Sequence, residues 1–316
     1  ETTVTQPAVP ALTSLRRTAA SQRGAASATS TSAGRSAPTV SSSDGAQVSI
    51  TTTRHNAANK PTPSSDSSSS QMSARARNSS LPASLSELPP GTDIFISFSS
   101  ASMAPFALNW VANLKRAGIT QILVGALDDK MLQICNEQGI PTLPLDGSSI
   151  KDRHAANLRF DYGAYKRMAA LKVAFYTRIL KSGFNVWACD ADTAWMQHPA
   201  PFVNEYPMQY ADMLTTTDCI DVEGDTRGGC WHVDHNTGLV YMRARPAVLE
   251  FTAAWQKKVE TSRDVMVRDQ AALNLLMREN FKAKAWDAPP DAEGGKQVRP
   301  IYLAWNNKIK IARLPL

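Results

Sequence analysis

The stretch that decides the fold is Gly183-Phe184-Asn185-Val186-Trp187-Ala188-Cys189-Asp190-Ala191-Asp192. Its segment from Val186 to Cys189 is continuously apolar, which is typical of a central parallel strand covered on both faces. Two aspartates follow the strand at once. Ligands of open α/β sheets bind beyond the carboxyl ends of the strands, so these aspartates lie where a binding crevice is expected. The stretch therefore predicts an α/β fold with an acidic site at one edge of its sheet.

Helical and extended patterns alternate on both sides of this strand. Ahead of it, apolar residues recur at helical spacing from about Tyr162 to Lys181, and Gly183 ends this helix. Further strands are expected at 93–98, 121–125, 141–145 and 211–216 and after 236–238, and further helices at 105–117, before Gly139 and from Pro246. This order is typical of βαβ units around a mixed, mainly parallel, Rossmann-like sheet.

The first 90 residues differ in composition from the rest of the chain. They contain no aromatic residue, whereas all 7 Trp, 7 Tyr, 9 Phe and 4 Cys follow them. Such a Ser- and Thr-rich segment cannot bury enough apolar surface to offset its ordering entropy. We therefore expect a disordered stem or linker at 1–90 and one globular domain at 91–316. The sequon Asn78-Ser79-Ser80 favours a secretory-pathway stem, and a transit-peptide remnant is the alternative.

The distribution of charge and the hydropathy of the chain bear on whether it binds nucleic acid or spans a membrane. The net charge is +6, and residues 1–90 supply +4 of it because they hold 8 Lys and Arg against 4 Asp and Glu. The folded part has no strong basic excess, so we expect no nucleic-acid partner. The chain has no run of about 18 apolar residues. Since it begins at Glu1 instead of Met, we expect a membrane anchor upstream of it.

The four cysteines allow three disulfide pairings. Cys219 and Cys230 enclose a loop of glycine and charged residues, and an oxidising compartment favours a disulfide between them over two free thiols. Cys135 and Cys189 lie in helical and apolar contexts and are expected to be small buried hydrophobic residues. The absence of a Cys-x-x-Cys motif argues against a structural zinc site.

Asp190 and Asp192 are candidate metal ligands. In an extended chain, residues two apart point the same way, so both carboxylates can face one crevice. Two carboxylates with open positions suit Mg²⁺ or Mn²⁺ shared with phosphate oxygens. The alternative is that both are exposed loop residues that cap the turn at 195–199.

Three ordered motifs resemble those of one enzyme family. The first runs from Arg159 to Pro199 and joins a helix with a Lys, the segment Gly183-Phe184-Asn185-Val186, and the strand that leads into Asp-x-Asp. The others are Asn236-Thr237-Gly238-Leu239-Val240-Tyr241-Met242-Arg243 and Asp269-Gln270-Ala271-Ala272-Leu273-Asn274. In order and spacing, over roughly residues 93–314, the motifs resemble the plant and green-algal nucleotide-diphospho-sugar transferases of glycosyltransferase family 77.

The resemblance implies a GT-A-type fold and transfer of a sugar from a nucleotide diphosphate with retention of configuration. Asp190 and Asp192 would bind Mn²⁺ or Mg²⁺, and Asp190 would also face the ribose of the nucleotide. The anomeric carbon develops oxocarbenium character as the diphosphate leaves, and a divalent ion neutralises the departing charge.

The second and third motifs supply further site residues. By the resemblance, Asn236 and Gly238 would line the crevice between donor and acceptor; the alternative is a plain turn that enters a strand. Asp269 and Gln270 would form the catalytic pair on the acceptor side. Asp269 would equally suit the N-cap position of the helix that follows.

Two basic residues of the long helix are candidates for binding the diphosphate. Lys172 and Arg167 are expected there, unless they belong to the solvated face of an amphipathic helix.

The carboxyl-terminal part departs from the family pattern. Family members continue to a histidine that supplies a third metal ligand, whereas this chain stops at Leu316, so we expect a truncated C-terminus or an incomplete metal site. His232, Asp234 and His235 are possible substitutes, although a loop position is the favoured interpretation for all three.

The resemblance also implies substrates and a compartment. The expected donor is a UDP-sugar of arabinose, xylose or galactose, and the expected acceptor is a cell-wall polysaccharide or a hydroxyproline-rich glycoprotein. Both point to the Golgi lumen and a type II membrane protein. The alternatives are a non-catalytic carbohydrate-binding or scaffold module of the same fold, and a phosphatase of the haloacid-dehalogenase type. The phosphatase pattern requires Thr or Val where this chain has Ala194.

Overall fold

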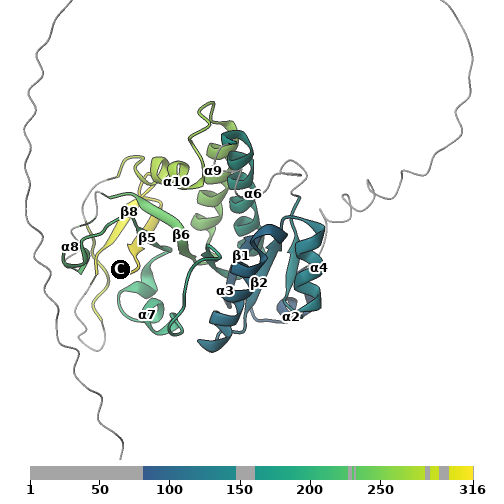
Figure 1. Ribbon diagram of the computed structural model, residues 1–316. Helices are drawn as coiled ribbons and strands as arrows, with labels where there is room; N and C mark the ends of the chain where they lie inside the picture. Colours follow the sequence, from purple (N-terminus) through teal and green to yellow (C-terminus); the bar gives the residue numbers. More distant parts are fainter. Residues whose placement is uncertain are drawn as a thin grey trace, which may run out of the picture. The chain divides into compact units, whose positions relative to one another are not determined.

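The computed structural model describes residues 81–146, 161–226, 230, 233–281, 285–291 and 299–315. Most of the expected stem, at 1–80, lies outside the described residues, and so do Arg159, Phe160 and His232. The described parts form an α/β fold in which helices cover both faces of one sheet (Figure 1).

Helices and strands alternate along most of the chain. The helices are α2 (Ala83–Ser86), α3 (Ala104–Arg116), α4 (Asp129–Glu137), α6 (Tyr162–Lys181), α7 (Ala200–Asn204), α8 (Val222–Thr226), α9 (Pro246–Thr261) and α10 (Asp269–Met277), with short 3₁₀ turns η1 (Ala101–Met103) and η3 (Met208–Tyr210). The strands are β1 (Asp93–Ser99), β2 (Ile122–Ala126), β3 (Thr142–Pro144), β4 (Asn185–Cys189), β5 (Met213–Thr217), β6 (His235–Met242), β7 (Ala285–Trp286), β8 (Ile301–Ala304) and β9 (Ile309–Arg313).

The strands of the described parts form one mixed sheet, which confirms the predicted fold class. Their order is β3-β2-β1-β4-β6-β5-β9-β8-β7. The parallel block is β3-β2-β1-β4, and β5 and β9 are also parallel. Strand β4 is central, as predicted, but parallel only on its β1 side, because β6 pairs with it in the antiparallel sense.

Side chains that alternate along the central strands build two apolar layers. Ile94 and Val186 point into a core shared with α6, α9 and α10, whereas Phe95 and Trp187 point into a second core shared with α3 and α4. All five residues of β4 are buried, because both faces of this strand are covered. Helices α6 and α9 lie side by side over the first face (Figure 1).

The bounds of α6 agree with the predicted 162–181. One strand differs from the expectation: β6 begins at His235, so Asn236 and Gly238 lie inside the strand and do not form a turn before it. The reason is a shift in the pairing register between Thr215 and Thr216 of β5: residues 237–239 of β6 bulge out, and Thr216 and Thr217 then pair with Asn236 and His235.

The folded part also begins ahead of the expected boundary at residue 91. Leu85 of α2 is only 3% exposed and packs in the core with α6, because this short helix carries one apolar residue toward the sheet. Among the helices that the structure describes, none combines the length and the hydropathy of a membrane-spanning segment.

The cysteines behave as expected from the sequence. Cys219 and Cys230 are joined by a disulfide, while Cys135 and Cys189 are free and buried. The disulfide encloses α8, and buried Asp225 of this helix forms an ion pair with Arg299 at 2.7 Å. The loop that follows β5 is thereby fixed to the body of the domain.

Candidate active site

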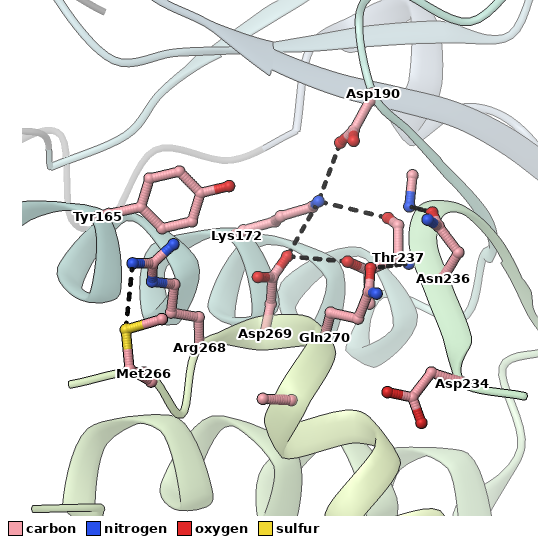
Figure 2. A pocket seen from close by; sticks show the side chains of 12 residues that line it. Tyr165, Lys172, Asp190, Asp234, Asn236, Thr237, Met266, Arg268, Asp269 and Gln270 are labelled. Atoms are coloured by element: carbon pink, nitrogen blue, oxygen red, sulfur yellow. Dashed lines mark hydrogen bonds and ion pairs between the residues drawn. The ribbon is translucent and has the colours of Figure 1, made fainter. Parts of the chain in front are cut away.

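A pocket of about 350 Å³ lies at the carboxyl end of β4, where α6, β6 and α10 meet (Figure 2). Most of the site residues expected from the sequence line it. They are Lys172, Asp190, Asn236, Gly238, Asp269 and Gln270.

Lys172 is the centre of the polar network in this pocket. Its Nζ atom lies 2.9 Å from Asp190 Oδ1 and 3.1 Å from Asp269 Oδ2, and it donates a hydrogen bond to the Thr237 carbonyl oxygen at 3.3 Å (Figure 2). The residue is 6% exposed. Burial alone lowers the pKa of its ammonium group, but Tyr176, Asp269 and Asp190 together outweigh burial and raise that pKa well above its usual value. Lys172 is therefore a permanent cation that joins three segments and is not part of a solvated helix face.

Helix α6 places Lys172 at the pocket because the helix starts at a defined residue. Asp161 is its N-cap and accepts a hydrogen bond from the Ala164 N–H at 2.9 Å. Tyr165 and Lys172 are two helical turns apart, so they share one side of α6 and both line the pocket.

Asp269 is the first residue of α10 and does not act as its N-cap. The N-cap position belongs to Arg268, and no side chain caps this helix. The carboxylate of Asp269 instead accepts a hydrogen bond from Thr237 Oγ1 at 3.2 Å and pairs with Lys172. Trp255 Nε1 donates to the Asp269 carbonyl oxygen at 2.8 Å and fixes the start of the helix. The carboxylate of Asp269 therefore makes its contacts in the pocket and does not cap the helix.

The side chains of Asp190 and Asp192 lie in different surroundings. The Asp190 N–H donates to the Gly238 carbonyl oxygen at 2.7 Å, and Thr193 N–H donates back to the Asp190 carbonyl oxygen at 3.1 Å. The chain thus turns directly after β4, and the extended geometry assumed from the sequence does not hold here. Asp190 lines the pocket, whereas Asp192 is exposed and lies outside the lining.

These two carboxylates still offer hard oxygen donors to a divalent cation. Within the residues that the structure describes, no group of three or more His, Cys, Asp and Glu side chains could hold a metal ion. Mg²⁺ and related ions need no such group when one or two carboxylates share them with substrate phosphates. Asp190, which lines the pocket, therefore fits an ion that is held jointly with a diphosphate, whereas Asp192 lies outside the lining.

Gly238 is required by the close approach of β6 to Asp190. A Cβ atom at this position would lie 2.9 Å from Asn236 Oδ1 and 3.2 Å from Asp190 Oδ2. The glycine in the Asn-Thr-Gly motif thus leaves room for the carboxylate of Asp190. Asn236 Oδ1 in turn accepts a hydrogen bond from the Gly238 N–H at 2.7 Å.

The second basic residue at the pocket is Arg268, which the sequence reasoning missed. Its guanidinium lies over the Tyr165 ring, 4.3 Å from the ring centroid, and Figure 2 shows it beside Met266. Arg167, the predicted residue, is exposed and lies outside the pocket lining. Arg268 directly precedes the Asp-Gln motif, so its position next to this motif could have marked it as a site residue in the sequence.

Thr237 and Asp218 were also missed. Thr237 lies between the two predicted residues of its motif and bonds to Lys172 and Asp269. Asp218 lies outside the pocket lining, but its carboxylate accepts hydrogen bonds from Asn236 Nδ2 at 2.7 Å and from Gln270 Nε2 at 2.8 Å. No pattern in the sequence marks Asp218, because its role depends on the pairing of β5 with β6.

Asp234 and His235, at the start of β6, have separate roles. Asp234 lines the pocket and forms an ion pair with Arg278. His235 is the first residue of β6 and not part of a loop, and its Nδ1 lies 2.6 Å from Thr215 Oγ1. Burial, together with nearby Arg313 and Arg278, lowers the pKa of His235 to about 3, so this imidazole is neutral at physiological pH.

Comparison with known proteins identifies the family. A family model described as nucleotide-diphospho-sugar transferase matches residues 117–315. The chain belongs to this family. Its folded part is therefore a glycosyltransferase domain, as the three motifs predicted, and the phosphatase alternative is excluded. The described pocket lies within the matched residues.

Two curated plant proteins are similar in sequence to this transferase domain. The chain is 25% identical over 228 residues to arabinosyltransferase XEG113 of Arabidopsis thaliana, which covers 70% of this chain and 32% of that protein. It is 28% identical over 113 residues to beta-arabinofuranosyltransferase RAY1 of the same plant, over 36% of this chain and 21% of that protein. The chain thus spans about a third and a fifth of the lengths of these relatives.

Two solved structures align with the domain at low identity. The apo form of mouse xyloside xylosyltransferase 1 has a TM-score of 0.37 and 10% identity over 61% of this chain and 83% of that one. The apo structure of WbbM, a bifunctional glycosyltransferase, has a TM-score of 0.38 and 12% identity over 60% of this chain and 37% of that one.

Proposed function

We propose that this domain transfers a sugar from a UDP-sugar to a glycan or glycoprotein acceptor, with retention of configuration. Membership of the nucleotide-diphospho-sugar transferase family supports a nucleotide-sugar donor. Arabinose is the first candidate for the transferred sugar, because both curated relatives are named as arabinosyl- or arabinofuranosyltransferases. Xylose and galactose are the other candidates.

The observation that carries this proposal is the network around Lys172. One buried cation is bonded to Asp190 after β4, to Thr237 in β6 and to Asp269 in α10. The network brings the three motifs that were recognised in the sequence to one pocket. An arrangement that fixes carboxylates in place ahead of the reaction is what electrostatic stabilisation of a charged transition state requires.

Each group in the pocket has a task in this proposal. Asp190 and Asp192 bind a divalent cation, Mn²⁺ or Mg²⁺, which when bound neutralises charge on the departing diphosphate. Lys172 holds the carboxylates of Asp190 and Asp269 in place, so that Asp269 and Gln270 face the sugar as it gains positive charge. Arg268 supplies the second positive charge at the pocket, where Arg167 was expected.

The acceptor and the compartment belong to the same proposal. We take the acceptor to be a cell-wall polysaccharide or a hydroxyproline-rich glycoprotein, and the compartment to be the Golgi lumen, with the Ser- and Thr-rich N-terminal segment as the stem of a type II membrane protein. The disulfide between Cys219 and Cys230 supports an oxidising compartment.

Calorimetric titration of the full chain with UDP tests the proposal. We expect binding in the presence of Mn²⁺, loss of binding with chelator, and loss of binding in an Asp190→Asn, Asp192→Asn double variant. Asp129→Asn is the matched control, because Asp129 is an exposed aspartate of α4 outside the pocket lining. A folded chain that binds UDP neither with nor without the metal would contradict the proposal, and binding without sugar transfer would support a non-catalytic module instead.

A further inference from the structure

Asp218 makes an unusual pair of contacts with the two amide side chains of the pocket. Its Oδ1 accepts a hydrogen bond from Asn236 Nδ2 at 2.7 Å, and its Oδ2 accepts one from Gln270 Nε2 at 2.8 Å. The two amides come from different elements, β6 and α10. One carboxylate therefore ties together two walls of the site.

The other end of each amide is also bonded. Asn236 Oδ1 accepts from the Gly238 N–H at 2.7 Å, and Gln270 Oε1 accepts from the Thr237 N–H at 3.3 Å. An ionised carboxylate only accepts hydrogen bonds, and a backbone N–H only donates them. Each amide thus has one orientation that satisfies both neighbours, with its nitrogen toward Asp218 and its oxygen toward β6.

The chain holds Asp218 in place through its backbone and its neighbour. The Asp218 N–H donates to the Asp234 carbonyl oxygen at 3.0 Å, and Cys219, the next residue, is bonded to Cys230. The position directly after β5 thus has little freedom, although the side chain itself is exposed.

We propose that Asp218 is a positioning residue for the transfer reaction, which acts by fixing the amide orientations of Gln270 and Asn236. This inference rests on the proposed function. It assigns Asp218 no contact with substrate: the residue acts through the two amides that line the pocket. With the orientations fixed, the same dipoles face the sugar in every turnover, and no reorientation is needed as charge develops.

Asp218→Asn is the most specific perturbation. The amide has the shape of the carboxylate but offers one acceptor oxygen, so it cannot accept from both Nδ2 of Asn236 and Nε2 of Gln270. One hydrogen bond is lost or one amide reverses. We expect kcat for the UDP-sugar to fall about tenfold, as loss of one hydrogen bond to a charged group implies. UDP affinity should stay within about twofold, since only the amide orientation changes.

A polarity swap separates positioning from simple structural damage. In the double variant Asp218→Asn, Asn236→Asp, the new amide at 218 donates to the carboxylate at 236 and still accepts from Gln270. The Gly238 N–H keeps an acceptor as well. All four hydrogen bonds and the total charge are restored, so the swap should recover the exchange protection of the Gln270 NH₂ protons and part of the kcat that Asp218→Asn loses. Asp221→Asn is the control, because it removes an exposed carboxylate from the same loop that contacts neither amide.

The experiment combines kinetics with NMR of the side-chain amides in the full chain. In the wild type, we expect the NH₂ protons of Asn236 and Gln270 to be protected from exchange, and one of the two signals to lose protection in Asp218→Asn. Unchanged amide signals, or a swap variant no faster than Asp218→Asn, would overturn the inference. If the wild type shows protected amides but releases no UDP from any UDP-sugar, the proposed function fails, and the catalytic part of this inference fails with it.

Discussion

Lys172 should be the residue on which the stability of the pocket depends most. Its ammonium group is buried and pairs with two carboxylates, one of them buried as well, since the Asp269 side chain is 10% exposed. Lys172→Met keeps most of the length of the side chain but removes the ammonium group and its charge. Asp269 is then left in the pocket wall without its counter-ion, next to Asp190.

The expected loss of stability follows from this geometry. Removing one partner of a buried ion pair costs about 3–5 kcal/mol. The Asp190 side chain is 44% exposed, so water screens that part of the network, and we expect the lower end, about 3 kcal/mol. For a domain of this size, the loss corresponds to a fall in Tm of about 6–12 °C.

Thermal and urea unfolding of the full chain, followed by tryptophan fluorescence, measures this loss. Lys181→Met is the matched control, because Lys181 is an exposed lysine at the end of the same helix and should shift Tm by less than about 2 °C. Adding Asp269→Asn to Lys172→Met removes the unpaired charge and should restore about 1 kcal/mol or more. A small effect of Lys172→Met, or additive losses in the double variant, would refute the reasoning.

Three further substitutions have defined outcomes. Gly238→Ala introduces a Cβ atom 3.2 Å from Asp190 Oδ2, so we expect weaker UDP binding by calorimetry with little change in Tm. The pKa of His235 is about 3 in the folded state against 6.5 ordinarily, so its contribution to stability is complete above pH 6.5 and is lost as the pH falls. Urea unfolding should show a loss of about 2 kcal/mol between pH 7.5 and pH 5, and His235→Gln should flatten this dependence. Replacing Cys219 and Cys230 by serine should cost about 2–3 kcal/mol, because the disulfide closes a short loop; an unchanged denaturation midpoint would contradict this.

Much of the fold could be predicted because local patterns agree with the tertiary structure. The apolar run from Val186 to Cys189 is buried on both faces, and the helical spacing from Tyr162 to Lys181 gives the bounds of α6. The antiparallel direction of β6 could not be read in the same way. A strand buried on both faces has the same apolar composition in either direction, so composition does not reveal which way its neighbour runs.

The site was predictable where a motif and its contacts lie in the same segment. Asp190, Gly238 and Asp269 are each part of a recognised motif and meet at the pocket. The same-side placement of Asp190 and Asp192 assumed an extended chain, whereas hydrogen bonds at Asp190 turn the chain at once. Local periodicity contains no information about such a turn.

The residues missed by the sequence reasoning act through contacts between distant segments. Asp218 bonds to Asn236 and Gln270, which are 18 and 52 residues away along the chain. Arg268 replaces Arg167 at the pocket because the start of α10 lies against Tyr165 of α6. Only the packing of the helices and strands decides which of several charged residues reaches the pocket.

The most direct test of sugar transfer is release of UDP by the full chain from UDP-arabinose, UDP-xylose and UDP-galactose in the presence of Mn²⁺. The account predicts release from at least one of these donors, with a rate in Asp190→Asn that is lower by about tenfold or more. Equal rates in the two chains, or no release from any donor by a chain that unfolds cooperatively on heating, would contradict it.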